Sequence, residues 1–464
     1  MSGLRSRGGP RGDLVAAGGA VGLFALAAGV GAVLYLAGRP VHASAAPITA
    51  LWRPHVGPGT PVAVGLAILI IRYGPALSRT LPWRRLLGAA YAGSVSWILA
   101  LALVDGWRRG VTGRLTTDHE YLSEVPGAGA VAGVLRGFAG RIVDGQPDSW
   151  TTHVAGHPPG AFLIFLGLDR IGLGGGTWAA LGCVAVAGLA AVAVPVTLRT
   201  LGDEDAARAA VPFLVLTPGA VWLGVSADGL FTGVVAAGLA LLATALVRRS
   251  ALAGLAAGLL LGFSLFLSYG FTLLIVLVAA VILLARRRSA RALGAAIAGA
   301  AAPVVVFALA GFWWLDGMHL VTVRYYQGIA AVRPYAYWVW ADLAILAVSA
   351  GPAAAVILRR AAGASRAAGA SRAAGASRAA GASRAALVRR LGPPVVLPVA
   401  ALLLMVAASL SGYSKAEVER IWQPFVPWLL AGAALIPPPA RTRWWLPAQA
   451  ATALLVNHLL LTTW

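Results

Sequence analysis

The sequence predicts an all-α protein that crosses a membrane several times. Of its 464 residues, 59% are hydrophobic and only 11% are charged, whereas about a quarter of a soluble domain is charged. The apolar residues recur in stretches without acidic or basic residues, each about long enough to cross ~30 Å of hydrocarbon. These stretches are Leu14–Gly38, Leu86–Val104, Thr177–Leu198, Gly229–Val247, Leu293–Leu315 and Trp444–Trp464. We therefore expect one membrane domain over residues 1–464.

Arginine accounts for most of the net charge of +21 and lies between the apolar stretches. This distribution follows the positive-inside rule and argues against nucleic-acid binding. It places the N-terminus and the following basic segments in the cytoplasm: Arg79–Arg85, Arg248–Arg249, Arg286–Arg291, Arg359–Arg390 and Arg441–Arg443. Threading the chain through these positions predicts about 13 spans, in a plasma membrane, with the C-terminus outside.

Two segments do not follow the simple pattern. Residues 159–173 begin outside by this threading and cannot be a single crossing, so we expect a re-entrant or surface helix unless one charge assignment is inverted. Residues 359–391 contain the sequence AAGASR four times in a row. A six-residue period gives no apolar helical face, which predicts a basic cytoplasmic linker between spans.

Acidic residues gather in the loop 105–158, which the threading places outside the membrane. Asp118 and Glu120 lie shortly after a span, and an amphipathic run over Val131–Val143 predicts a surface helix. The loop ends in Trp150–Gly160, which contains His153 and His157. The alternative interpretation of the two acids is an ordinary solvated loop.

Further polar residues are predicted on the same face. Asp228 begins an apolar stretch, where it could equally cap a helix. Later outer segments carry cations that depart from the positive-inside rule and could neutralise a phosphate. Their tyrosines and tryptophans could stack on a sugar or form an interfacial belt. The residues concerned are Arg324, Arg333, Lys415, Arg420 and Trp422.

The order of these motifs resembles the first outer loop of GT-C-fold membrane glycosyltransferases, such as protein O-mannosyltransferases and lipid A aminoarabinose transferases. In that family an acidic pair, an aromatic residue, a surface helix and a Pro-Pro motif follow one another. The chain has Asp118-His119-Glu120-Tyr121 and then His157-Pro158-Pro159-Gly160. It departs from the pattern because His119 splits the acids, His157 replaces a lysine, and two additional spans precede the loop. The resemblance is clearest over residues 86–250.

The resemblance implies a GT-C-like fold and sugar transfer from a polyprenyl-phosphate donor to a glycan, lipid or protein acceptor outside the cytoplasm. Asp118 or Glu120 would be the catalytic base, and Arg420 or Arg324 would hold the phosphate. Substrate-binding roles fall to Tyr121, His157, Asp228, Arg333, Lys415 and Trp422. No cofactor is required, although a divalent metal ion stays open because the family is divided on it. Membrane lipids are the other expected partners.

Two other functions stay open from the sequence. A transporter or flippase of a lipid-linked glycan would carry ionisable residues near the bilayer midplane, and the predicted spans are nearly free of charge. A non-catalytic protein of envelope assembly would need only one altered acid. The sugar, the acceptor and the oligomeric state do not follow from the sequence.

Overall fold

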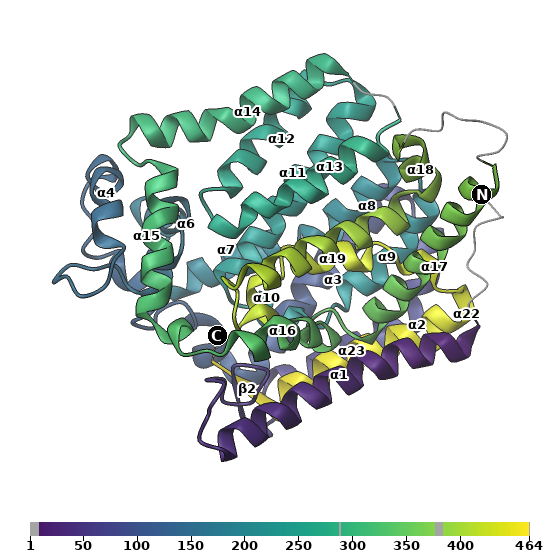
Figure 1. The fold of residues 1–464 in the computed structure, drawn as a ribbon, viewed down its shortest axis with the longest axis horizontal. Helices are drawn as coiled ribbons and strands as arrows, with labels where there is room; N and C mark the ends of the chain where they lie inside the picture. Colours follow the sequence, from purple (N-terminus) through teal and green to yellow (C-terminus); the bar gives the residue numbers. More distant parts are fainter. Residues whose placement is uncertain (1–8, 287–288, 376–383, 464) are drawn as a thin grey trace.

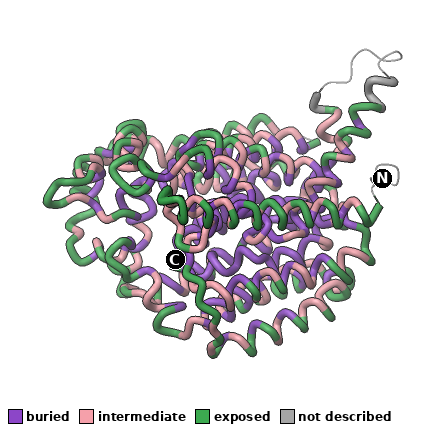
Figure 2. Tube along the Cα trace, turned by 60° about the horizontal axis from the view of Figure 1, so that its bottom comes forward, coloured by how far each residue is buried: buried purple, intermediate pink, exposed green. Residues whose placement is uncertain are grey.

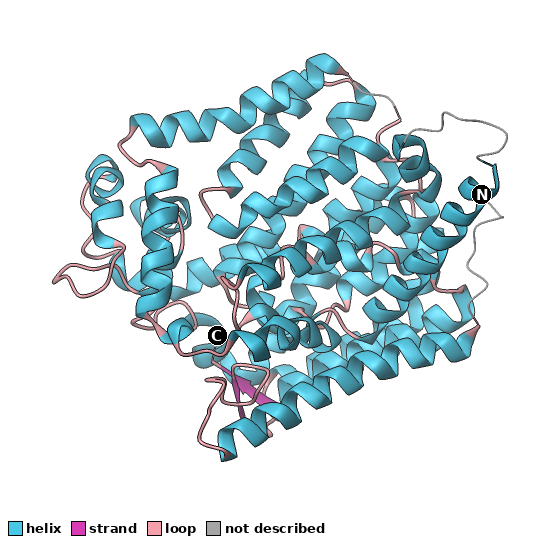
Figure 3. Cartoon of the chain, in the orientation of Figure 1, coloured by secondary structure: helices cyan, strands magenta, loops and turns pink. Residues whose placement is uncertain are grey.

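The computed structural model describes residues 9–286, 289–375 and 384–463 and is helical almost throughout (Figure 1, Figure 3). The strands named within these residues are β1 (Ala50–Trp52) and β2 (Leu460–Thr462), which pair antiparallel with Ala50 opposite Thr462. The predicted all-α class is therefore confirmed. The short sheet joins two segments from opposite ends of the chain.

Seven helical segments in the described chain are long and apolar enough to cross a membrane, and eight if one bent pair counts as a span. The expected number of 13 spans is not confirmed. The seven are α1 (Pro10–Leu36), α2 (Gly59–Thr80), α3 with its 3-10 extension (Trp83–Asp105), α7 and α8 (Gly176–Thr200), α11 (Ala227–Arg248), α14 (Ala290–Leu309) and α19 (Pro393–Ser411). The bent pair consists of α16 (Tyr335–Ser349) and α17, which meet at 110°.

The remaining helices are shorter and fill the bundle or its ends. Apolar ones are α12 (Ala251–Ser264) and α13 (Ile275–Leu284). The others are α4 (Val131–Gly137), α5 (Thr152–Gly156), α6 (Pro159–Arg170), α9 (Glu204–Val215), α10 (Ala220–Leu223), α15 (Trp314–Gln327), α18 (Arg384–Leu391), α20 (Val418–Ile421), α21 (Val426–Leu430), α22 (Pro438–Ala440) and α23 (Leu446–Leu459).

Helix α11 lies at the centre of the bundle, and α1 and α2 lie at its edge. In its apolar window 72% of the α11 residues are buried, against 11% in α1 and α2. Figure 2 shows the buried residues gathered in the interior of the bundle. Small residues allow close packing of α12 on α14, since a Cβ atom at Gly258 would lie 2.0 Å from the carbonyl oxygen of Ala296. Such contacts associate helices in a lipid environment, where the hydrophobic effect adds little.

The loop 105–158 collects at the end of the bundle where α4, α6 and α15 lie, at the left of Figure 1. Its surface helix is shorter than expected, because α4 ends at Gly137 and a 3-10 turn follows over Ala139–Arg141. Phe138 and Ile142 are fully buried, so this segment packs on the protein. Helix α6 has 12 residues, about 18 Å, which is too short for a crossing. A re-entrant or surface position for residues 159–173 stays a prediction.

The basic repeat segment is partly helical, which the sequence did not predict. Helix α17 runs over Pro352–Gly375 and so includes the first copies of AAGASR. Alanine is the strongest helix former, and this local preference outweighs the missing apolar face. Arg359 and Arg360 both contact Asp13, which is 2% exposed, and thereby join α17 to α1. The later copies fall mostly outside the described residues.

Candidate functional site

Six of the residues that the sequence singled out meet at one end of the bundle. They come from loops and helix ends far apart in the sequence: the loop after α3, the segment around α5, the first turn of α11, the turn before α16 and the segment after α19. The six are Glu120, Tyr121, Asp228, Arg333, Lys415 and Arg420, with His157 stacked beside them. We call them, together with His153 and Glu417, the ionic cluster.

Glu120 and His153 form the acidic edge of the ionic cluster. Glu120 Oε1 lies 2.9 Å from His153 Nδ1, and both side chains are less than a tenth exposed. On its other side, His153 Nε2 lies 3.5 Å from Arg420 Nη2. His153 therefore lies between the carboxylate of Glu120 and the guanidinium of Arg420.

Burial acts to raise the pKa of Glu120, but the neighbouring His153 and Arg420 outweigh it and leave the pKa below its usual value. Glu120 is therefore a carboxylate at neutral pH, with its orientation fixed by His153.

Arg420 lies between two carboxylates at the centre of the ionic cluster. Its Nη1 is 3.0 Å from Asp228 Oδ2, and its Nη2 is 3.6 Å from Glu417 Oε2. Glu417 also contacts Arg333, with 2.9 Å between Oε1 and Nη2. Arg420 is buried, so these carboxylates compensate a guanidinium removed from water.

The backbone that carries Glu417 is strained. Ala416 and Glu417 have φ angles of 69° and 63°, in the left-handed region that non-glycine residues seldom adopt. Asp342 Oδ1 accepts the Ala416 N–H at 3.2 Å, and Arg333 holds both Glu417 and the Lys415 carbonyl oxygen. Residues in such a conformation cluster at functional sites, because the surroundings must hold them there.

Aromatic rings cover the apolar side of the ionic cluster. Tyr121 is 2% exposed and stacks between His153 and Phe165, with centroid distances of 6.1 Å and 5.1 Å. His157 lies 5.8 Å from Tyr121, and its Nδ1 contacts the His153 carbonyl oxygen. Burial lowers the pKa of His157 to about 4. His157 is thus neutral at physiological pH and cannot replace the charge of the lysine found in related motifs.

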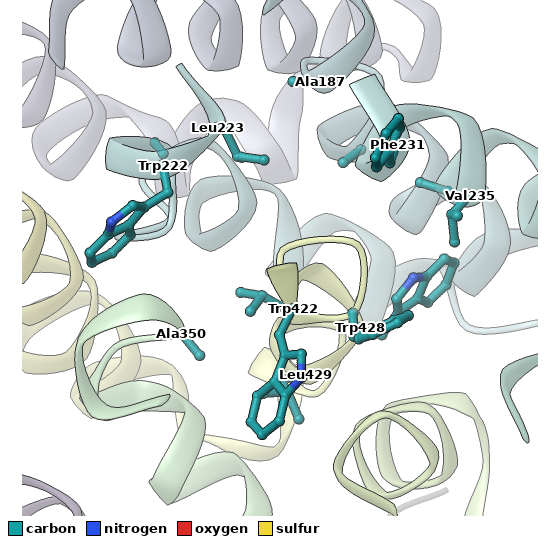
Figure 4. Close-up of a cluster of buried hydrophobic side chains, with 14 of the residues drawn as sticks. Ala187, Trp222, Leu223, Phe231, Val235, Ala350, Trp422, Trp428 and Leu429 are labelled. Atoms are coloured by element: carbon teal, nitrogen blue, oxygen red, sulfur yellow. The ribbon is translucent and has the colours of Figure 1, made fainter. Parts of the chain in front are cut away.

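Three predicted site residues do not join the ionic cluster. Asp118 is exposed, whereas Glu120, two residues later, is buried. Arg324 is paired with Asp144, a half-exposed residue of the loop, and donates to the Trp150 carbonyl oxygen at 3.4 Å. Trp422 lies in the hydrophobic core beside Trp222, Trp428 and Leu429 (Figure 4).

Sequence reasoning missed His153 as a partner of the acid, together with Glu417 and Glu419. His153 precedes His157 by one helical turn, and the Pro-Pro motif directed attention to the second histidine. Glu417 and Glu419 lie in a segment where the sequence drew attention to cations. Glu419 is fully buried, and its Oε1 accepts the Thr49 N–H at 3.0 Å.

Glu419 makes the stability of the protein depend on pH. Burial raises the pKa of Glu419 to about 7, so between pH ~4.5 and ~7 the folded chain keeps a proton that the unfolded chain loses. Stability from this group is therefore lost as the pH rises through that window. Glu419→Gln lacks this titration. We therefore expect the free energy of unfolding of Glu419→Gln, relative to that of the wild type, to rise by about 3 kcal/mol between pH 5 and pH 8. The measurement is thermal unfolding in detergent.

His157 changes the stability with pH in the opposite direction, because its pKa is lowered in the folded chain and the protein loses stability as the pH falls below 6.5. It is present in both proteins and cancels in the difference. Parallel stability profiles for Glu419→Gln and the wild type would contradict the assignment.

A metal ion does not fit the ionic cluster. Among the described residues no three His, Cys, Asp or Glu side chains are grouped to hold one. Arg420 occupies the space between Asp228 and Glu417, where a cation would otherwise be placed. No step of the chemistry below uses a metal.

No protein-family model and no curated protein matches this sequence. Among solved structures, the chain is similar to the apo oligosaccharyltransferase of Archaeoglobus fulgidus, with 13% identity over 82% of this chain and 56% of that one, at a TM-score of 0.41. It is also similar to the oligosaccharyltransferase AglB of that organism in complex with an inhibitory peptide and a dolichol-phosphate, with 12% identity over 75% of this chain and 50% of that one, at a TM-score of 0.37. A third match is that enzyme's complex with Zn and sulfate, with 15% identity over 79% and 53% of the two chains, at a TM-score of 0.38. These proteins are GT-C glycosyltransferases, the class that the loop motifs resemble. The chain spans about half of their length.

Proposed function

We propose that this chain is a membrane glycosyltransferase that moves a sugar from a polyprenyl-phosphate donor to an acceptor hydroxyl outside the cytoplasm. The observation that carries the proposal is the buried Glu120 carboxylate, 2.9 Å from His153 and beside the Asp228–Arg420 pair. A buried, oriented carboxylate at the end of a helical bundle costs stability, and such groups are retained for function more often than for folding.

Glu120 is the proposed base. The acceptor hydroxyl gives its proton to Glu120 while its oxygen forms a bond to the anomeric carbon of the donor sugar. The bond between that carbon and the phosphate oxygen breaks, and the lipid phosphate leaves with the electron pair. Because its pKa is lowered, Glu120 takes the proton as the new bond forms and not before.

His153 and Arg420 are positioning residues in this scheme. His153 Nδ1 contacts Glu120 Oε1, which directs the second carboxylate oxygen elsewhere. Arg420 contacts His153 from the other side and pairs with Asp228. Asp228 is the group best placed to accept hydrogen bonds from sugar hydroxyls or to stabilise positive charge at the anomeric carbon.

The experiment that tests the proposal uses the purified chain in liposomes. Polyprenyl phosphates carrying radiolabelled pentoses or hexoses are supplied as donors, with a membrane extract as the source of acceptors. We expect labelled sugar to appear on the acceptor, together with free polyprenyl phosphate. Movement of the intact donor across the bilayer, with no sugar released from phosphate, would instead show a flippase and refute the transferase.

A further inference from the structure

An open hollow of about 750 Å³ lies in the segment that follows α3. It is lined by Asp105, Gly106, Trp107, Arg108, Arg109, Thr112, Gly113 and Thr116. The segment is folded tightly, because a Cβ atom at Gly110 would lie 1.8 Å from the carbonyl oxygen of Ala102. Trp107 is 50% exposed at the rim of the hollow, as tryptophans are at the membrane–water interface.

One carboxylate holds two arginines at the base of this hollow. Asp105 Oδ2 lies 2.5 Å from Arg109 Nη1 and 3.0 Å from Arg114 Nη2, and Asp105 Oδ1 contacts His55. The same arginines donate to Thr462 at the end of β2. The segment that lines the hollow is thus held in place by His55 and by Thr462 of the short sheet.

The hollow has an excess of positive charge. Arg108 and Arg109 line the hollow, and Arg114 shares Asp105 with Arg109. The three positive charges of these arginines against the one negative charge of Asp105 leave an excess of about two. The ionic cluster, in contrast, already surrounds Arg420 with Asp228 and Glu417. Arginines at this end of the bundle also oppose the charge bias that orients a membrane protein, so they need another reason to be there.

Arg114 is the buried member of this set, with 7% of its side chain exposed. Burial lowers the pKa of Arg114 to about 10, against the opposite effects of Asp105 and, more weakly, Glu120. Within the described part of the chain, its buried Nε has no hydrogen-bond partner. Both features indicate a guanidinium whose charge is incompletely compensated by the protein.

We propose that this hollow binds the phosphate of the polyprenyl-phosphate lipid, with Arg108 and Arg109 in contact with the phosphate oxygens and Arg114 behind them. The inference rests on the proposed function and assigns the phosphate to a place other than Arg420. Arg114 shares Asp105 with the hollow and is weakly influenced by the charge of Glu120, which links the hollow to the proposed base.

The charge of the hollow fits the product of the reaction. A sugar-linked lipid phosphate is a diester with one negative charge, and the lipid phosphate that leaves is a monoester that carries close to two. Two uncompensated arginine charges match the monoester better than the diester. The hollow would therefore stabilise charge as it develops on the leaving group, which is where electrostatic stabilisation accelerates a reaction.

Binding of sugar-free polyprenyl phosphate tests the inference without requiring turnover. The full chain in nanodiscs is titrated with this lipid, and Trp107 supplies the fluorescence signal. We expect the double variant Arg108→Gln/Arg109→Gln to bind it about tenfold or more weakly, since two charge-assisted hydrogen bonds are lost. The matched control is Arg136→Gln, at an exposed arginine of the same loop, which we expect to bind like the wild type.

Phosphatidylglycerol and inorganic phosphate separate the possible sources of the phosphate. We expect both to compete poorly, the first because it is a diester and the second because it has no chain to anchor it. Equal competition by phosphatidylglycerol, or unchanged binding by a double variant with wild-type thermal stability, overturns the inference. Glu120→Gln should still bind polyprenyl phosphate, so a failure of the transferase proposal is seen separately, as an absence of sugar transfer by the wild type.

Discussion

Glu120→Gln is expected to lower the rate of sugar transfer by about 10²- to 10⁴-fold, the usual contribution of a positioned general base. The amide has the size of the carboxylate and can keep the contact with His153 Nδ1, so the packing of both side chains is kept. It cannot take the acceptor proton at neutral pH. The loss should therefore appear in kcat, measured as the initial rate of label transfer from a polyprenyl-phosphate sugar.

Asp118→Asn is the matched control for this substitution. It removes the same charge two residues earlier in the chain, from an exposed side chain outside the ionic cluster. We expect less than a threefold change in rate, because charges in water are screened. A larger loss in Asp118→Asn than in Glu120→Gln would assign the base to Asp118 and contradict the role derived from burial.

The sequence predicted the end of the bundle at which polar residues gather, because span length and charge bias are local properties. Glu120, Asp228, Arg333 and Arg420 could each be placed on one side by counting crossings, even though the count itself is not confirmed. The structure has them in one connected set, with Arg420 between Asp228 and Glu417. Their placement on the extracytoplasmic side stays a prediction.

The pairing within the site did not follow from the sequence. Arg324 and Arg420 have the same chemistry and lie on comparable loops, yet Arg324 meets Asp144 and Arg420 meets Asp228. The difference depends on the left-handed backbone at Ala416 and Glu417, which no turn signal such as glycine or asparagine announces. Likewise, the contact of Arg114 with Thr462, at the other end of the chain, has no signal in the sequence of the loop.

Arg420→Met is expected to destabilise the protein by about 3–5 kcal/mol, the cost of breaking a buried ion pair from one side. Methionine fills much of the space of the arginine stem, so the loss is mainly electrostatic. It leaves Asp228, which is 4% exposed, as a buried carboxylate without its cation. Glu417 keeps Arg333 and should suffer less. The measurement is the thermal unfolding midpoint in detergent. The control is Arg324→Met, which we expect to destabilise the protein by less than ~1 kcal/mol because the partner of Arg324, Asp144, is half exposed.

The double variant Asp228→Asn/Arg420→Met separates the two roles of Arg420. Removing both charges eliminates the unpaired carboxylate. The double variant should therefore regain most of the stability that Arg420→Met loses, because the two residues are coupled in one network. Sugar transfer should not return, because His153 loses the guanidinium that fixes its ring and Glu120 loses its orientation. Full recovery of both would mean that Arg420 only compensates Asp228. Recovery of stability alone would show that the Asp228–Arg420 pair serves sugar transfer as well as stability.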